Sequence, residues 1–441
     1  MSAASPSLVE HRPDGATAPL PCAPQRLQDT GLPPLLLAEL VLKAMQQHAL
    51  GSLHELSRHL CLGPLLLEAL LGQLRREAVV EVQHRGALAG DVSYQLTRAG
   101  RARAAEALAR NLYSGPAPVP LAAYVQRVQA QSVADMGLTR ERFEQAMASV
   151  VMPAHLREQL GAAMNSRRAK LLYGPPGAGK TFLCERMASL LQGAVAVPHA
   201  VEVHGEIISV FDPLVHRPLP AAAASASLYD AHRADARWVL CERPVVIMGG
   251  ELTLEMLDLV FDARAGFYHA PPHFKANNGL LLVDDLGRQI VTPRQLLNRW
   301  ILPMEQQHDH LMLRNGIKLR VPFDTLLFFS TNLRPEELGD EAFLRRIGYK
   351  IFVGPVPPED YRHILRQSCE QYGVPYDDAA FDSLVHEMHQ REGRPLLPAY
   401  ARDLVSQIVD FATYNGLKPE LSPRLMKWAW RNYFANEAAW A

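Results

Sequence analysis

The segment 174–181 constrains the fold of this chain more than any other stretch of the sequence. It reads GPPGAGKT and matches the pattern GxxxxGK[ST] at every defined position. The apolar run 171–173 precedes it, and residues 181–192 follow with the apolar spacing of an amphipathic helix. Glycines in such a loop let backbone N–H groups approach an anion at the start of a helix. The motif therefore predicts a phosphate-binding loop between a strand and a helix of an α/β fold.

The residues of this loop have separate expected roles. Lys180 supplies a positive charge for the β- and γ-phosphates of a nucleotide, and the Thr181 hydroxyl is an expected ligand of Mg²⁺. The rest of the loop is expected to surround the phosphates: Gly174, Pro175, Pro176, Gly177, Ala178 and Gly179. A glycine-rich turn with a chance lysine is the alternative, but it does not account for the strand and helix on either side.

A second motif lies further along the chain. The segment 279–285 reads GLLLVDD, an apolar strand that ends in two acidic residues. Buried strands of parallel sheets read as continuous apolar runs, and such sheets bind ligands at the carboxyl ends of their strands. We therefore expect Asp284 to position Mg²⁺ and Asp285 to activate the attacking water. Taken alone, the segment could equally be an acidic loop after a core strand.

From Lys170 onward the sequence alternates apolar strands with amphipathic helices. PVVIMG (244–249), for example, is followed by LTLEMLDLVF (252–261), for which we expect a helix. This alternation predicts a parallel sheet covered by helices, and the chain becomes all-helical from about Pro357. The sequence thus predicts an α/β fold. Its phosphate-binding loop resembles that of the P-loop NTPases, and this resemblance implies a three-layer αβα core with a C-terminal helical lid.

The N-terminal region carries a different pattern. Residues 35–48, 52–60 and 64–78 are expected helices, and VVEVQ (79–83) and VSYQLT (92–97) are expected strands before a last helix. Helix, helix–turn–helix, two-stranded wing and helix is the order of a winged helix-turn-helix domain. YQLTRAGR (94–101) resembles the same superfamily. The expected domains are a disordered tail (1–32), a winged-helix-like domain (33–112), a Pro-rich linker (113–124), a nucleotide-binding domain (125–355) and a lid (356–441).

With both motifs in place, the chain resembles an AAA+ ATPase over roughly residues 125–435. GPPGAGKT is similar to the Walker A motif of that family, and LLLVDD is similar to its Walker B motif. After Walker B and before the apolar strand TLLFF (325–329), we expect a hairpin with an Asn-Gly turn in DHLMLRNGIKLRVPFD (309–324). A hairpin here is typical of the branch that includes the MoxR-like proteins. A further hairpin is expected at 200–212. The resemblance implies ATP and Mg²⁺ as cofactors.

The resemblance also implies roles for four more residues. Asn332 follows the apolar strand TLLFF, where the family has sensor 1, and would position water beside Asp285. DEAFLRRI (340–347) is similar to the segment with the arginine finger, a residue that reaches the ATP of a neighbouring subunit. By register we favour Arg346, with Arg345 second. PAYARDL (398–404) resembles sensor 2, which makes Arg402 a γ-phosphate contact. Surface ion pairs with nearby acids are the alternative for these arginines.

One position departs from the family. AAA+ proteins usually have Asp-Glu at Walker B, whereas this chain has Asp284-Asp285. Aspartate is one methylene shorter, and a displacement of about 1 Å can cost on the order of 100-fold in rate. We therefore expect ATP binding to be retained, and slow hydrolysis is compatible with this change.

Charge and composition exclude several classes. The chain has 45 Lys+Arg and 46 Asp+Glu, so its net charge of −1 excludes a globally basic nucleic-acid coat. Its five cysteines include no CxxC pair, which favours reduced thiols over a zinc ribbon. No run reaches the roughly 18 apolar residues of a membrane span, and the N-terminus lacks the features of a secretory signal. We expect a cytoplasmic protein with no membrane partner.

Two functions fit these sequence features. The first is a ring-forming, ATP-hydrolysing remodelling motor, a hexamer by analogy with the family, that acts on a protein client. The second is a DNA-associated, ATP-dependent switch that uses residues 33–112, with arginines 85, 98, 101 and 103 as candidate phosphate contacts. The expected recognition helix starts with leucines and a glutamate rather than base-reading side chains, which favours a protein partner.

Overall fold

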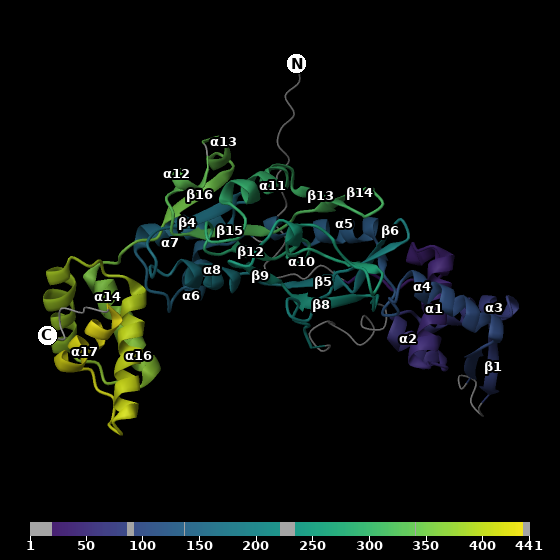
Figure 1. Ribbon diagram of the computed structural model, residues 1–441, viewed down its shortest axis with the longest axis horizontal. Coiled ribbons are helices and arrows are strands. Elements are labelled where there is room, and N and C mark those ends of the chain that lie inside the picture. The colour runs from purple at the N-terminus through teal and green to yellow at the C-terminus, as the bar shows by residue number, and fades with distance from the viewer. Residues whose placement is uncertain (1–19, 86–91, 136, 221–233, 340, 435–441) are drawn as a thin grey trace, which may run out of the picture. The chain divides into compact units, whose positions relative to one another are not determined.

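The computed structural model describes residues 20–85, 92–135, 137–220, 234–339 and 341–434 (Figure 1). The chain divides into two compact units, each assembled from separate stretches of sequence. The first comprises Met1–Gly137, Leu191–Leu281 and Gln295–Leu326, and the second comprises Leu138–Leu190, Leu282–Arg294 and Leu327–Ala441. Among the helices in the described ranges, none combines the length and the apolarity needed to cross a bilayer.

The N-terminal part of the first unit has its helices and strands in the expected order. They are α1 (Pro34–His48), α2 (Leu53–Leu60), α3 (Pro64–Arg76), β1 (Val80–Arg85), β2 (Val92–Leu96) and α4 (Arg98–Arg110). Strands β1 and β2 pair antiparallel, and α1 packs against α2, α3 and α4. The start of α2 is stabilised by Ser52 and Glu55, whose side chains cap each other's backbone N–H groups.

The rest of the first unit is rich in strands. A five-stranded sheet has the order β10-β11-β7-β6-β3, and β13 and β14 form a separate antiparallel pair, as do β5 and β8. The elements are η1 (Leu27–Thr30), β3 (Val119–Pro120), α5 (Leu121–Ala130), η2 (Val133–Asp135), β5 (Ala194–Pro198), β6 (Ala200–Val203), β7 (Glu206–Ser209), β8 (Trp238–Glu242), β9 (Val245–Met248), η4 (Glu255–Leu257), β10 (Val260–Asp262), β11 (Phe267–His269), α10 (Pro272–Lys275), α11 (Pro293–Gln306), β13 (His308–Met312) and β14 (Lys318–Pro322). Both hairpins expected from the sequence, β6–β7 and β13–β14, are confirmed.

The expected helix over 252–261 is wrong. Only the short 3-10 helix η4 forms there, and Val260 already belongs to β10, which pairs antiparallel with β11. The connection between these strands is a turn in which the Asp262 carboxylate accepts hydrogen bonds from the backbone N–H groups of Arg264 and Ala265. Gly266 follows at φ 73°, a conformation that glycine adopts without strain. This turn chemistry outweighs the helical spacing of the apolar residues.

The end of the expected disordered tail is ordered, which corrects that expectation, and the expected linker contributes β3 and the start of α5. The guanidinium of Arg237 is buried, is paired with Asp235 at 2.8 Å, and donates to the backbone carbonyls of Thr30 at 3.1 Å and Pro118 at 3.3 Å. Because a buried arginine needs acceptors for its N–H groups, these bonds hold both segments in place. Residues 1–19 of the expected tail lie outside the described residues.

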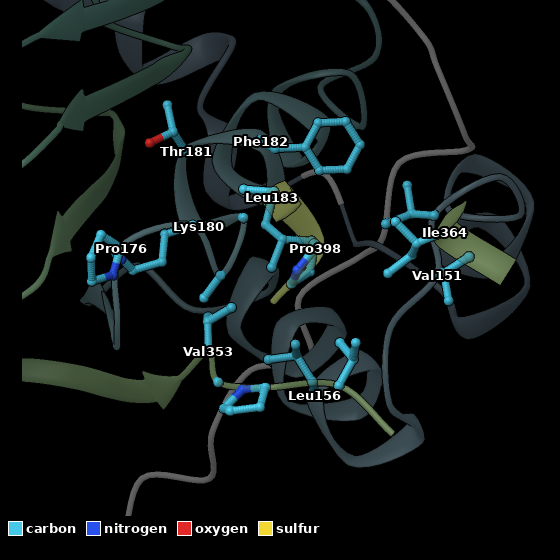
Figure 2. A pocket seen from close by; sticks show the side chains of 18 of the residues that line it. Val151, Leu156, Pro176, Lys180, Thr181, Phe182, Leu183, Val353, Ile364 and Pro398 are labelled. Carbon is cyan, nitrogen blue, oxygen red and sulfur yellow. The ribbon is translucent and has the colours of Figure 1, made fainter. Parts of the chain in front are cut away.

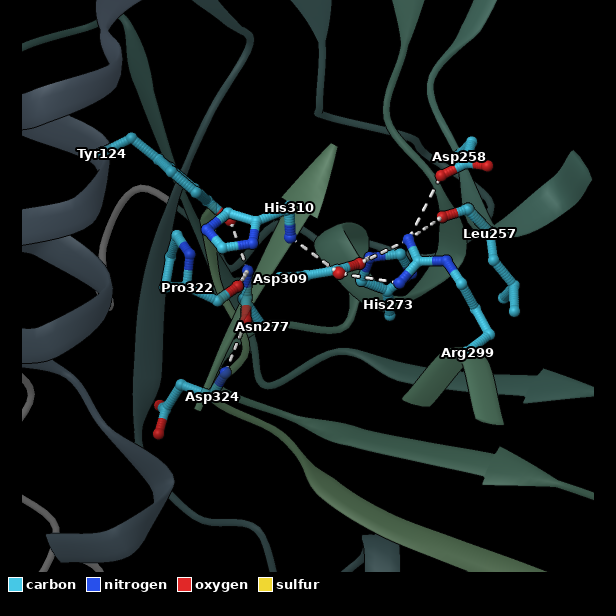
Figure 3. A network of polar contacts seen from close by, with 10 residues as sticks. All are labelled: Tyr124, Leu257, Asp258, His273, Asn277, Arg299, Asp309, His310, Pro322 and Asp324. Carbon is cyan, nitrogen blue, oxygen red and sulfur yellow. Dashed lines mark hydrogen bonds and ion pairs between the residues drawn. The ribbon is translucent and has the colours of Figure 1, made fainter. Parts of the chain in front are cut away.

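A buried polar network connects α10, α11 and β13 of the first unit (Figure 3). The Asp309 carboxylate on β13 is 1% exposed and receives two hydrogen bonds from Arg299 of α11, both at 2.8 Å. His273 of α10 is fully buried and lies 3.0 Å from the same carboxylate. Arg299 also contacts the exposed Asp258 at 3.2 Å. These partners lower the pKa of Asp309 to about 2 although burial acts in the opposite direction.

Replacing Asp309 with alanine is expected to destabilise the protein by about 3–5 kcal/mol at neutral pH, because Arg299 would lose its buried counter-charge. Urea unfolding followed by circular dichroism measures this. Since the folded pKa lies below the ordinary 3.8, the stabilisation is fully present above about pH 4 and is lost as the pH falls toward 2. Asp258→Ala, which removes the exposed carboxylate from the same arginine, is the control and should cost about 1 kcal/mol or less. Equal effects of the two variants would contradict the prediction.

The second unit holds the expected α/β core. Its strands follow the order β16-β4-β15-β12, and both β15 and β16 pair parallel with β4. The elements of the core are α6 (Arg140–Ala146), α7 (Ala154–Met164), β4 (Ala169–Tyr173), α8 (Lys180–Ala188), β12 (Leu280–Val283), β15 (Leu326–Thr331), α12 (Pro335–Leu338), α13 (Glu341–Leu344) and β16 (Ile347–Phe352). The predicted parallel sheet flanked by helices is therefore confirmed. Strands β4, β12 and β15 consist almost entirely of buried residues, as their apolar sequences predicted.

A helical region follows β16, as the sequence predicted. It contains α14 (Pro358–Tyr372), α15 (Asp378–Asp382), the π-helix η5 (Ser383–Gln390), α16 (Pro398–Tyr414) and α17 (Pro423–Tyr433). Helix α16 packs against α14 and α17 (Figure 1). The apolar core between these helices includes Tyr361, Leu404 and Trp430, all nearly inaccessible to solvent.

Candidate nucleotide-binding site

Three polar segments follow strands of the second unit at their carboxyl ends. The glycine-rich loop follows β4, Asp284 follows β12, and Asn332 follows β15. In the parallel register, Thr331 of β15 lies opposite Tyr173 of β4, so Asn332 begins level with the loop. Because β12 is the next strand of the sheet, the acidic pair reaches the same edge. This is where ligands of open α/β sheets bind.

The backbone of the glycine-rich loop requires glycine at particular positions. Gly174 has φ 150°, and a Cβ atom there would lie 2.0 Å from the carbonyl oxygen of Val353. Gly179 has φ 92° and directly precedes the first turn of α8, and a Cβ there would meet no atom within 4 Å. The backbone directly before α8 therefore borders open space, and the glycines place no side chain there. That arrangement suits an anion.

Lys180 lies within this loop and is nearly buried. Its ammonium group donates to the carbonyl oxygens of Gly174 at 2.9 Å and Pro175 at 3.0 Å, and to Oδ1 of Asn332 at 2.8 Å. Burial holds the pKa of Lys180 below its ordinary value, while the carboxylates of Asp285 and Asp284 act to raise it. A phosphate group would compete with these carbonyls for the ammonium and would favour its charged form.

The Thr181 hydroxyl contacts the first acidic residue directly. Its Oγ1 lies 3.0 Å from Oδ1 and 2.9 Å from Oδ2 of Asp284. The Asp284 carboxylate also accepts a hydrogen bond from the backbone N–H of Asp285 at 3.0 Å. A hydroxyl and a carboxylate are the hard oxygen ligands that Mg²⁺ prefers, and Mg²⁺ is commonly held by one or two carboxylates plus substrate phosphates. The residues present at this site therefore fit Mg²⁺.

The second acidic residue is held by Asn332. The side-chain amide of Asn332 donates to Oδ1 of Asp285 at 2.9 Å, and its oxygen accepts from Lys180. Asp285 has φ 49°, a left-handed conformation that aspartate tolerates better than most residues. Lys180, Asn332 and Asp285 thus form one hydrogen-bonded chain from the loop to the acidic strand end.

A cavity of about 700 Å³ opens beside Lys180, Asn332 and Asp285. Its polar part includes Lys180, Thr181, Asp285 and Asn332. Its apolar part includes Leu156 of α7 and Ile364 of α14 (Figure 2). In Figure 2, Val151 and Ile364 lie to the right of the view, and Pro176 and Thr181 lie to the left. The volume is in the range of small-molecule sites, and the combination of a glycine-rich loop and a lysine with an apolar part suits a nucleotide.

The three predicted arginines have different places. Arg402 lines the cavity from α16, is 62% exposed, and contacts Asp403 at 3.2 Å. Arg345 and Arg346 follow α13, with Arg345 exposed and Arg346 half-buried. Neither of them is among the described residues that line the cavity. The other predicted loop residues from Pro176 to Thr181 line it, whereas Gly174 and Pro175 line a smaller neighbouring cavity of about 410 Å³.

Sequence reasoning missed several residues of this site. The segment 353–356 joins β16 to α14 and lines the cavity, as do Ser149, Leu156 and Arg288. Ser330 also lines it, and its buried hydroxyl has no hydrogen-bond partner among the described residues. The segment 149–156 precedes β4 and carries no recognisable motif, so only its position in the fold reveals its place in the site. For Arg288 a signal existed, because it follows shortly after the acidic pair.

Comparisons with known proteins give little further information. Residues 357–432 match the model of a family described as "Domain of unknown function (DUF8689)". No curated protein matches the chain. Among solved structures, it is similar to NtrX from Brucella abortus in complex with ATP, at 16% identity and a TM-score of 0.39, over 64% of this chain and 54% of NtrX. It is also similar to the RuvB Holliday junction branch migration motor of Thermotoga maritima, at 14% identity and a TM-score of 0.33, over 69% of this chain and 72% of RuvB.

Proposed function

We propose that this chain is an AAA+ protein that binds and hydrolyses ATP. The main support for the proposal is a set of hydrogen bonds beside one cavity. They join Lys180 to Asn332, Asn332 to Asp285, and Thr181 to Asp284. A structural loop would not need a buried lysine, two carboxylates and an amide at the edge of a parallel sheet. Each of these groups has a function in phosphoryl transfer.

In the proposed reaction, the residues of the site have separate roles. Lys180 and the N–H groups at the start of α8 would bind the phosphates. Thr181 and Asp284 would hold Mg²⁺, and the charge of that ion would offset part of the negative charge of the phosphates. Asp285 orients water for attack on the γ-phosphate, with its carboxylate held by Asn332. Arg402 contacts the γ-phosphate from the lid. Because Asp285 is shorter than glutamate, we expect slow basal hydrolysis.

We further propose that the site is completed by Arg346 of a second copy, which implies a ring of subunits. In support, Arg345 and Arg346 do not line the cavity of their own chain in the part that the structure describes. An arginine that stabilises transition-state charge has to reach the γ-phosphate. A finger supplied by a neighbour satisfies that requirement.

The N-terminal region favours a protein client over DNA. The exposed face of α3 presents Leu65, which is 72% exposed, together with Glu68 and Ala69, and these are not base-reading side chains. Two of the candidate phosphate contacts are used within the region itself. Arg103 pairs with Glu77 at 2.6 Å, and Arg101 donates to the carbonyl oxygen of Leu96 at 3.1 Å. We therefore propose a remodelling motor whose N-terminal region selects a protein partner.

The test is steady-state ATP hydrolysis per subunit, measured against protein concentration. We expect the specific rate to rise with concentration and then to saturate, because a neighbouring subunit completes the site. A rate that is independent of concentration would contradict the proposed ring. If the protein neither binds nor hydrolyses ATP at any concentration, the proposed enzyme function fails.

A further inference from the structure

The loop that carries Asp285 also carries an arginine, Arg288, whose backbone position is fixed by local hydrogen bonds. The backbone N–H of Arg288 donates to the carbonyl oxygen of Asp285 at 2.9 Å. The Gln289 side chain donates to the carbonyl oxygen of Asp284 at 2.7 Å and accepts from the backbone N–H of Gly287 at 2.9 Å. Gly287 has φ 109°. The loop is therefore a defined turn at the edge of the cavity.

The Arg288 side chain differs from the other cations at this cavity. Lys180 is engaged by two carbonyl oxygens and Asn332, and Arg402 contacts Asp403. Arg288 lines the cavity and is exposed, and its guanidinium has no hydrogen-bond or ion-pair partner within the described ranges. Arg288 is thus a cation at the cavity that its surroundings leave available for an anionic ligand.

We infer that Arg288 contacts the γ-phosphate of ATP bound to its own chain. The inference rests on the proposed function, which places Asp285 at the γ-phosphate. Because Arg288 belongs to the same tight turn as Asp285, it lies at that end of the nucleotide rather than at the base. A guanidinium can bind two oxygens of a phosphate at once, which suits the terminal phosphate with its unshared oxygens. The chain thereby supplies an arginine in cis that distinguishes ATP from ADP.

The test compares the affinities of full-length wild-type and Arg288→Ala protein for Mg·ATP and Mg·ADP, measured by isothermal titration calorimetry. The binding of ATP is expected to weaken on the order of 10-fold, because a hydrogen bond to a charged group is lost. The binding of ADP is expected to stay within about 2-fold of wild type. Arg288→Lys retains the positive charge but lacks the paired N–H groups of a guanidinium. Its affinity for ATP should therefore lie between those of wild type and Arg288→Ala.

Arg294→Ala is the matched control. Arg294 is an exposed arginine at the start of α11, a few residues further along, and it does not line the cavity. Its removal should leave both affinities unchanged. Thermal melts without nucleotide should be the same for both variants and wild type, because neither side chain is buried.

Unchanged ATP affinity in Arg288→Ala would overturn the inference, and so would an equal loss of ATP and ADP affinity. A failure of the proposed function looks different: wild-type protein would bind no ATP, or would bind it no better than Lys180→Ala. In that case the affinities of Arg288→Ala and wild type would be equally weak.

Discussion

Lys180→Ala is expected to reduce ATP hydrolysis by about 10²–10³-fold, which is the effect of removing one preorganised stabiliser of transition-state charge. The wild-type ammonium bridges the glycine-rich loop and Asn332, so its loss removes the charge that faces the phosphates and one hydrogen bond to the residue that holds Asp285. Release of inorganic phosphate by purified protein measures the rate. ATP affinity, measured in parallel, should fall as well.

Lys427→Ala provides the control for this substitution. Lys427 lies on α17, is 49% exposed, and forms an ion pair with Glu387 at 2.6 Å. Surface pairs of this kind contribute little, so its hydrolysis rate should equal that of wild type. A hydrolysis rate for Lys180→Ala near the wild-type value would exclude the proposed site, because any remaining ATPase activity would then come from elsewhere or from a contaminant.

Arg346→Ala is expected to lower hydrolysis by about 10³-fold or more while leaving ATP affinity close to wild type, as for an arginine finger that acts on the transition state. Arg345→Ala should have the smaller effect, because register favours Arg346. The rates are measured at a protein concentration at which the wild-type specific rate has saturated. Equal losses in both variants would leave the assignment to Arg346 unsupported.

Mixing two inactive variants tests whether the finger acts between subunits. Lys180→Ala retains its arginine but has a defective nucleotide site, whereas Arg346→Ala retains the nucleotide site but lacks the finger. If Arg346 acts on a neighbour, mixed assemblies contain pairs in which an intact site meets an intact finger, and part of the activity returns. A mixture no more active than its separate components would contradict action in trans.

The position of several elements could be predicted from sequence because their signals are local. The hairpin β13–β14 has an Asn-Gly turn between alternating residues, and the buried strands β12 and β15 are continuous apolar runs. The segment 252–261 does not form the helix expected from its sequence. Its apolar spacing fits a helix, but the turn at Asp262 and Gly266 and the pairing of β10 with β11 decide its conformation.

In the expected tail and linker, tertiary structure orders segments whose composition gives no sign of packing. Residues 114–120 are rich in proline and read as a linker, but Ala117 and Val119 are completely buried. The composition of a segment indicates how well water solvates it. It does not indicate whether a buried donor elsewhere in the chain will form hydrogen bonds with the carbonyl oxygens of that segment. Arg237 is such a donor, and its guanidinium donates to the carbonyl oxygens of Thr30 and Pro118.

For the candidate site, the glycine-rich loop could be predicted from sequence, because the conformation of eight consecutive residues depends on their own backbone preferences and on the strand and helix beside them. The sequence also indicated which strand ends carry acids and an amide. The hydrogen bonds that join Lys180, Asn332 and Asp285, and the position of Arg288 at the same cavity, follow from the packing of the folded chain. Those contacts depend on strand order and on how segments distant in sequence pack together, which no local pattern encodes.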